Sequence, residues 1–180
     1  KEEVLHKKFT SVQNVLSVLF SYNKDLHLCA LLTYGCLLRP HREVRELTWG
    51  DFNENLTTIS LAGNRNKGKR NRIIPVPAYV REHLTGGPSQ HNIFSGTDKP
   101  YNQYYFAQLW QRFKKEHPEV VMTGQTLYSL RHSGAIAVYE KTKNIKILQT
   151  VMGHSDMATS LTYLRGLEVN ELDVAVLPEL

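Results

Sequence analysis

Cysteine is scarce in this chain of 180 residues, which contains only Cys29 and Cys36. Both lie in LHLCALLTYGCLL, an almost wholly apolar run that is typical of a helix in the core. Seven residues of helix separate two Cα atoms by roughly 10 Å, whereas a disulfide requires less than about 7 Å. We therefore expect two buried thiols in a protein of a reducing cytosol.

Long apolar runs, internal repeats and low-complexity segments are also missing. No apolar stretch reaches the roughly 20 residues that span a membrane, so no membrane partner is expected. The first residues, KEEVLHKK, are too charged for a signal peptide, and the absence of an initial Met indicates a portion of a longer protein. A metal-dependent nuclease would need a cluster of carboxylates, and no convincing cluster is present.

The composition is that of a globular domain. Hydrophobic residues make up 41% and charged residues 22% of the chain, which favours one domain over residues 1–180. The net charge of +5 and the isoelectric point near 9.2 favour an anionic partner.

Periodicity predicts an α+β fold that is mainly helical. Helices are expected over residues 9–21, 26–38, 40–49, 77–84, 102–116, 126–141, 144–151 and 156–164. A small antiparallel β-hairpin is expected where LTTISLAG and RNRIIPVP flank a turn-rich segment. The segment LEVNELDVAV fits a loose helix whose apolar side has no partner within the chain.

An arginine precedes the third expected helix, in LLRPHREVRELTW. Pro40 suits the first position of a helix, where free backbone N–H groups attract anions. Arg39 at this entrance would bind two phosphate oxygens through its guanidinium group. The alternative is a surface arginine beside Glu43.

Five cations occupy the hairpin turn over residues 65–72: Arg65, Lys67, Lys69, Arg70 and Arg72. A flexible lysine on such a turn can reach into a minor groove or toward a leaving oxygen. The alternative is a solvated basic surface.

The expected helix LYSLRHSGAIAVY places Tyr128 and Arg131 three residues apart, on one face. Apolar and small residues flank Arg131, so its stem is expected to be partly buried. A buried guanidinium group needs an anion, and none stands four residues away. Either a bound ligand or a distant carboxylate satisfies it.

A histidine and a tyrosine lie nine residues apart in VMGHSDMATSLTYLRG. His154 alone is typical of a capping or core residue, and Tyr163 alone is typical of a packing residue. Together they fit a reaction in which a phenol attacks and an imidazole assists.

In order along the chain, these four places resemble the catalytic domain of the tyrosine recombinases, the phage integrase family, over essentially the whole sequence. The family pattern has an arginine after an apolar helix, a hairpin lysine eight residues before a proline, an H-x-x-R-H helix, and G-H with a tyrosine nine residues on. The matching residues are Arg39, Lys67 with Pro75, Arg131 with His132, and His154 with Tyr163. One box alone is a weak match, whereas four in order are specific.

Two positions depart from the family pattern. Tyr128 replaces the histidine of H-x-x-R, which puts a histidine base at that place in doubt. Glu43 lies four residues after Arg39, where the familiar box has a glutamate after three. This box is more similar to integrases of mobile elements than to chromosome-dimer resolvases.

The resemblance implies a site-specific recombinase that cleaves and rejoins DNA through a 3′-phosphotyrosyl bond, and that integrates or excises a mobile element. The bond preserves the energy of the phosphodiester, so no cofactor and no metal are expected. Tyr163 would be the nucleophile, Arg39 and Arg131 would clamp the phosphate, His154 would contact it, and Lys67 would protonate the leaving 5′ oxygen. Tyr128 would donate a hydrogen bond to the phosphate or hold a neighbour. DNA contacts are expected from Arg42, Arg65, Lys69, Arg70, Arg72 and His132.

The implied partners are double-stranded DNA at specific attachment sites, a homotetramer in the synaptic complex with a monomer in isolation, and accessory DNA-bending proteins. The location implied is the bacterial cytoplasm, at the nucleoid. An N-terminal DNA-binding domain is expected to be absent here, and residues 167–180 are expected to dock on a neighbouring protomer. The alternatives are a type IB topoisomerase-like enzyme, a non-catalytic DNA-binding regulator, and a helical protein with coincidental spacing.

Overall fold

A computed structural model describes residues 7–63, 71–154 and 156–164. Its elements follow the order α1 (Val12–Tyr22), α2 (Lys24–Gly35), η1 (Pro40–Val44), η2 (Trp49–Asp51), β1 (Thr58–Leu61), β2 (Arg72–Pro75), α3 (Ala78–Arg81), α4 (Tyr105–Glu116), α5 (Leu127–Thr142), α6 (Ile145–Met152) and α7 (Met157–Leu164). The α+β class, mainly helical with a small antiparallel hairpin, is confirmed. Among the described helices, none has the length and apolarity to cross a bilayer.

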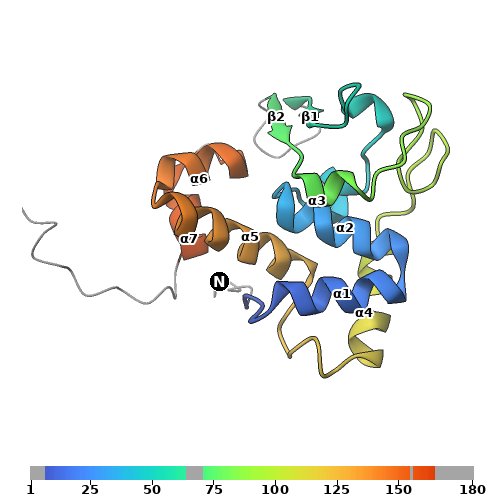
Figure 1. Ribbon diagram of the computed structural model, residues 1–180. Coiled ribbons are helices and arrows are strands. Elements are labelled where there is room, and N and C mark those ends of the chain that lie inside the picture. The colour runs from blue at the N-terminus through green and yellow to red at the C-terminus, as the bar shows by residue number, and fades with distance from the viewer. Residues whose placement is uncertain (1–6, 64–70, 155, 165–180) are drawn as a thin grey trace, which may run out of the picture.

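The first two helices start at side chains that cap them. The Ser11 side chain accepts a hydrogen bond from the Asn14 backbone N–H at the start of α1, and Asn23 caps α2 in the same way. Helix α2 packs against α1 and α5, as Figure 1 shows at the centre of the molecule. Cys29 and Cys36 are buried free thiols, as expected.

The hairpin lies over α2 and α3, at the top of Figure 1. Strand β1 pairs antiparallel with β2, so that Ile59 faces Ile74 and Leu61 faces Arg72. Ile59 and Leu61 are buried, as the alternating pattern predicts. The turn between the strands, residues 64–70, lies outside the described residues.

The segment after Arg39 differs from the helix expected over residues 40–49. It is a five-residue π-helical turn, in which the Val44 N–H donates to the Arg39 carbonyl at 3.0 Å. A π-turn accommodates one residue more than an α-turn. The wider turn returns Glu43 to Arg39 although the spacing is four rather than three.

The approach to Arg39 is held by packing. Leu37 has a φ of 52°, an unfavourable conformation for a branched side chain. Its side chain is buried in a cluster with Ala135, Leu148 and Met152. The turn after α2 is therefore fixed by α5, which carries Arg131, and by α6, which precedes His154.

Candidate active site

Arg39 and Glu43 form the first part of the site. The Arg39 Nη1 atom lies 2.5 Å from Glu43 Oε1, and the Arg39 backbone N–H donates to Oε2 at 2.9 Å. The Glu43 side chain is 1% exposed and that of Arg39 is 18% exposed. Glu43 thus orients Arg39 and does not withdraw it from solvent. The binding of phosphate by Arg39 stays a prediction.

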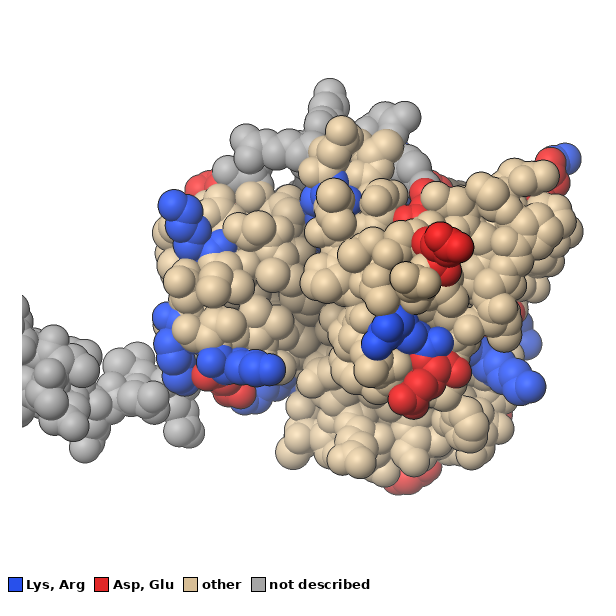
Figure 2. All heavy atoms as spheres, turned by 45° about the horizontal axis from the view of Figure 1, so that its top comes forward, with Lys and Arg blue, Asp and Glu red and all other residues tan. Residues whose placement is uncertain are grey.

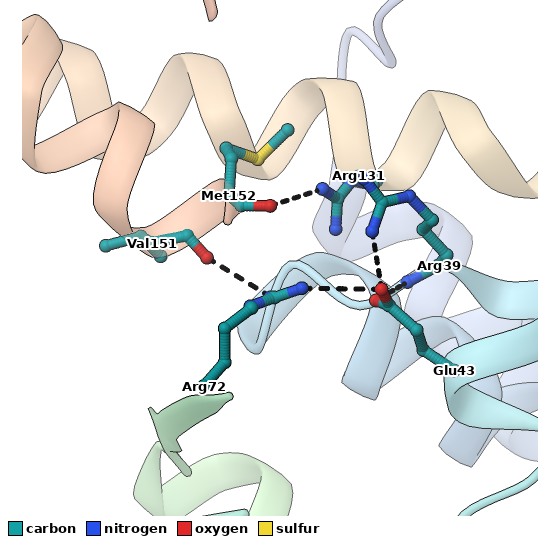
Figure 3. A network of polar contacts seen from close by, with 6 residues as sticks. All are labelled: Arg39, Glu43, Arg72, Arg131, Val151 and Met152. Carbon is teal, nitrogen blue, oxygen red and sulfur yellow. Dashed lines mark hydrogen bonds and ion pairs between the residues drawn. The ribbon is translucent and has the colours of Figure 1, made fainter. Parts of the chain in front are cut away.

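Arg131 is fully buried on α5. Its Nη2 atom donates to the Met152 carbonyl at 2.9 Å, so this guanidinium group is tied to the end of α6. Figure 3 shows the guanidinium groups of Arg39, Arg72 and Arg131 gathered beside Glu43. Arginines that are about 30 to 90 positions apart in sequence meet here because α5 packs on α2 and Arg72 extends from the hairpin to Glu43 and Val151.

Arg72 is part of this cluster, although the sequence placed it with the basic turn. Its Nη1 atom lies 3.3 Å from Glu43 Oε1, and its Nη2 atom donates to the Val151 carbonyl at 3.3 Å. Burial lowers the pKa of Arg72, Glu43 opposes that shift, and the nearby arginines reinforce it. Strand alternation carries the signal that could have predicted this position, since Arg72 lies opposite buried Leu61.

His154 follows the C-terminal end of α6, where Gly153 takes a left-handed conformation with φ of 66°. Its Nδ1 atom lies 2.9 Å from the hydroxyl of Ser160, a fully buried residue of α7. Burial first, and then the charges of Arg131, Arg39 and Arg72, lower the pKa of His154 to about 4. The imidazole is therefore neutral at physiological pH and retains one N–H donor.

Ser160 is the residue that the sequence reasoning missed. It stands three positions before Tyr163, so the His154 hydrogen bond links the end of α6 to the helix that carries the predicted nucleophile. The backbone of Tyr163 is in α7, and its side chain falls outside the described part of the structure. Lys67, Arg65, Lys69 and Arg70 also lie outside the described residues.

The remaining predicted residues are spread over the rim and the interior. Tyr128 is half-buried, with its ring 6.3 Å from that of His41 on the π-turn, so it lies beside the arginine box. Arg42 is exposed. His132 is 6% exposed on α5, and its contact with DNA stays a prediction.

A groove of about 500 Å³ opens beside the cluster, between β2 and α6. Arg72, Gly153 and His154 line it together with Lys146. Figure 2 shows the molecule hollowed between the α6–α7 side, at the left, and the rest. Among the described residues on that face, Lys and Arg side chains are scattered among Asp and Glu.

The electrostatics of the cluster suit an anion. Three guanidinium groups lie beside the single carboxylate of Glu43, and His154 adds a neutral donor. Arginine groups fork onto phosphate oxygens and stabilise charge that develops on them. Among the described residues, no three His, Cys, Asp or Glu side chains lie together as a metal site would require.

Solved recombinases share this fold. A XerA recombinase structure matches with a TM-score of 0.71 at 14% identity, over 95% of this chain and 61% of that one. A lambda integrase dimer bound to a COC′ core site matches with a TM-score of 0.70 at 19% identity, over 97% of this chain and 65% of that one. A Tn1549 transposon integrase in complex with a circular intermediate DNA matches with a TM-score of 0.65 at 20% identity, over 88% and 61%.

Sequence comparisons agree with the fold. A tyrosine recombinase XerA of Thermococcus onnurineus (strain NA1) is 27% identical over 160 residues, which are 86% of this chain and 55% of that protein. A tyrosine recombinase XerC of Xylella fastidiosa (strain 9a5c) is 30% identical over 135 residues, 67% of this chain and 42% of that protein. The chain spans about half the length of the curated relatives that it matches. Residues 10–168 match the phage integrase family. The chain therefore belongs to the phage integrase family, with the fold of a tyrosine recombinase catalytic domain.

Proposed function

We propose that this chain is the catalytic part of a site-specific DNA recombinase that acts on a mobile element. The observation that carries the proposal is the meeting of Arg39, Arg72 and Arg131 beside one carboxylate, with His154 next to them. The net positive charge of this cluster and the adjoining groove suit one backbone phosphate of a duplex. Lambda integrase and the Tn1549 integrase, which share the fold, are bound to DNA in their structures.

In this mechanism the Tyr163 oxygen attacks the scissile phosphorus and the bond to the 5′ oxygen breaks. The DNA 3′ end is left as a phosphotyrosyl ester, and Lys67 donates a proton to the departing 5′ oxygen. Arg39 and Arg131 stabilise the charge that builds on the non-bridging oxygens. A free phenol has a pKa of about 10, and nearby cations favour its ionised form. Attack of a 5′ hydroxyl on the ester reverses these steps and rejoins the strand.

His154 and Tyr128 have supporting roles in this mechanism. The neutral imidazole donates its N–H to a phosphate oxygen while the Ser160 hydroxyl holds its Nδ1 atom. Tyr128 donates its hydroxyl to the phosphate or to a neighbour. Arg42, Arg65, Lys69 and Arg70 contact the DNA backbone, which fixes position without reading sequence.

The partners follow from the same chemistry. Exchange between two DNA sites uses four active sites, so the proposed synaptic assembly is a homotetramer, with residues 167–180 docked on a neighbouring protomer. Accessory DNA-bending proteins act with it at the attachment sites.

A nicked duplex that carries the recombinase's own site tests the proposal. Cleavage near the nick releases a short fragment, so that religation fails and the covalent adduct accumulates. We expect an adduct with the wild-type chain and none with Tyr163→Phe, which should still bind the duplex. Tyr104→Phe is the matched control, because Tyr104 is 60% exposed, and it should form the adduct at the wild-type rate.

Two outcomes contradict the proposal. An adduct formed by Tyr163→Phe would exclude Tyr163 as the nucleophile. Relaxation of supercoiled DNA at any sequence, with no recombinant product from paired sites, would favour the topoisomerase-like activity instead.

A further inference from the structure

Arg72 joins three separate segments of the chain. It lies on β2, its Nη1 atom is 3.3 Å from Glu43 on the π-turn, and its Nη2 atom donates to the Val151 carbonyl of α6 at 3.3 Å. Figure 3 shows the side chain rising from the hairpin to span the gap between Val151 and Glu43. The two ends of one guanidinium group are thereby committed to two different elements.

The surroundings of Arg72 distinguish it from a surface cation that contacts DNA. Its side chain is 8% exposed, whereas the next residue on the strand, Ile73, is 76% exposed. Its Nε atom is buried without a hydrogen-bond partner among the described residues. Burying a donor in this way is unfavourable, so the contacts at the two ends of the group determine its position.

Gly153 provides the space that Arg72 occupies. A Cβ atom at position 153 would lie 2.5 Å from Arg72 Cδ and 2.6 Å from Nε. Any side chain at position 153, just before His154, would therefore collide with the Arg72 side chain. The carbonyls of Val151 and Met152 accept from Arg72 and Arg131 respectively, so neighbouring arginines hold successive residues at this end of α6.

We infer that Arg72 is a positioning residue. On one side it holds Glu43, which is bound to Arg39, and on the other side it holds the residues that precede His154, so that the distance between Arg39 and His154 is fixed. The inference rests on the proposed recombinase function. Without Arg72, Glu43 keeps its bonds to Arg39 and Met152 keeps its bond to Arg131, but the link that Arg72 makes between Val151 and Glu43 is lost. Arg39 and the His154 imidazole are then no longer held at the distance that lets both contact the same phosphate. Cleavage therefore slows, while the groove still binds DNA.

The test separates chemistry from binding. We would measure the cleavage rate at saturating nicked duplex, and the Kd of the uncleaved duplex as a function of salt, for Arg72→Met. We expect cleavage to slow about 100-fold while Kd changes less than about threefold. Arg72→Lys retains the charge and one of the two contacts, so it should recover about tenfold of the lost rate and shows that the effect is not a failure to fold.

Lys146→Met is the matched control, because Lys146 is an exposed cation that lines the same groove. Loss of a cation that faces the bound DNA should weaken binding and lower the salt slope by about one. If Arg72→Met behaves in that way, Arg72 is a DNA contact and the inference is wrong.

A double variant gives a second measurement. Because Arg72 acts partly through Glu43, the double variant Glu43→Gln with Arg72→Met should lose less cleavage rate than the product of the two single losses. For two independent sites, the fold-losses in rate would multiply. Multiplicative losses would overturn the inference while leaving the wild-type adduct, and so the proposed function, intact. Failure of the wild-type chain to form any adduct would overturn both.

Discussion

At the scale of single residues, the imidazoles of His27 and His154 connect the structure to pH. Burial lowers the pKa of His27 to about 4, with a smaller effect of His83, and His154 is lowered to the same value. Both histidines would have a pKa near 6.5 in the unfolded chain. Between those values the unfolded state binds more protons than the folded state, so acid favours unfolding.

We predict that the free energy of unfolding falls as the pH is lowered from about 6.5 to about 4. The loss from the two rings should total about 1 to 3 kcal/mol once the partial exposure of the rings is allowed for. Urea unfolding at a series of pH values measures it. His27→Gln removes one of the two groups and should flatten the dependence, and an unchanged slope would show that His27 is not held in its neutral form.

Some residues of the site were predictable from sequence and others were not. The spacing of the motifs pointed to Arg39, Arg131 and His154, which the fold brings together or ties to adjoining segments. Charge alone groups Arg72 with the basic turn. The alternation of the strand, which places Arg72 beside buried Leu61, indicates instead that its side chain points inward. Ser160 carries no motif, and only the path of α7 past His154 reveals it.

At the scale of elements, the close approach of α5 to α2 places Arg131. A Cβ atom at Gly134 would lie 2.4 Å from the Tyr34 carbonyl oxygen and 2.6 Å from a Leu37 methyl group. The first obstacle is backbone, which cannot move aside without shifting a helix. One absent side chain thus sets the distance between the helix that bears Arg131 and the turn that leads to Arg39.

We predict that Gly134→Ala lowers the free energy of unfolding by about 1 to 3 kcal/mol through overpacking. Thermal unfolding measures the change. Glu140→Ala on the exposed end of α5 is the control and should shift stability by less than about 0.5 kcal/mol. Wild-type stability in the Gly134 variant would mean that the two helices separate freely, which contradicts close packing as the cause of the Arg131 position.

Helix positions followed from the sequence because apolar periodicity and capping residues are local signals. Helices α1, α2 and α4 to α7 each begin and end within a few residues of the expected bounds. The π-turn was not predictable in this way, because the Pro40 signal is equally compatible with an α-helix. In this turn Glu43 contacts Arg39 and also Arg72 of the hairpin, and the contact with Arg72 is tertiary.

At the scale of the whole molecule, the site exists only because distant segments converge. Arg39 follows α2, Arg72 lies on the hairpin, Arg131 lies on α5, and His154 follows α6. Of these residues, Arg72 and His154 line the groove. Sequence order alone could list these residues, whereas their common orientation depends on the packing of α5 against α2. Supporting one phosphate from several elements fixes its position more firmly than one flexible loop could.

The most direct test of this convergence is a crystal structure of the chain trapped covalently on a nicked duplex that carries its site. The account predicts the phosphorus bonded to the Tyr163 oxygen, with guanidinium nitrogens of Arg39 and Arg131 about 3 Å from its non-bridging oxygens. It also predicts Arg72 still bound to Glu43 and Val151. A phosphorus attached elsewhere, or lying beyond hydrogen-bonding reach of both arginines, would contradict the account.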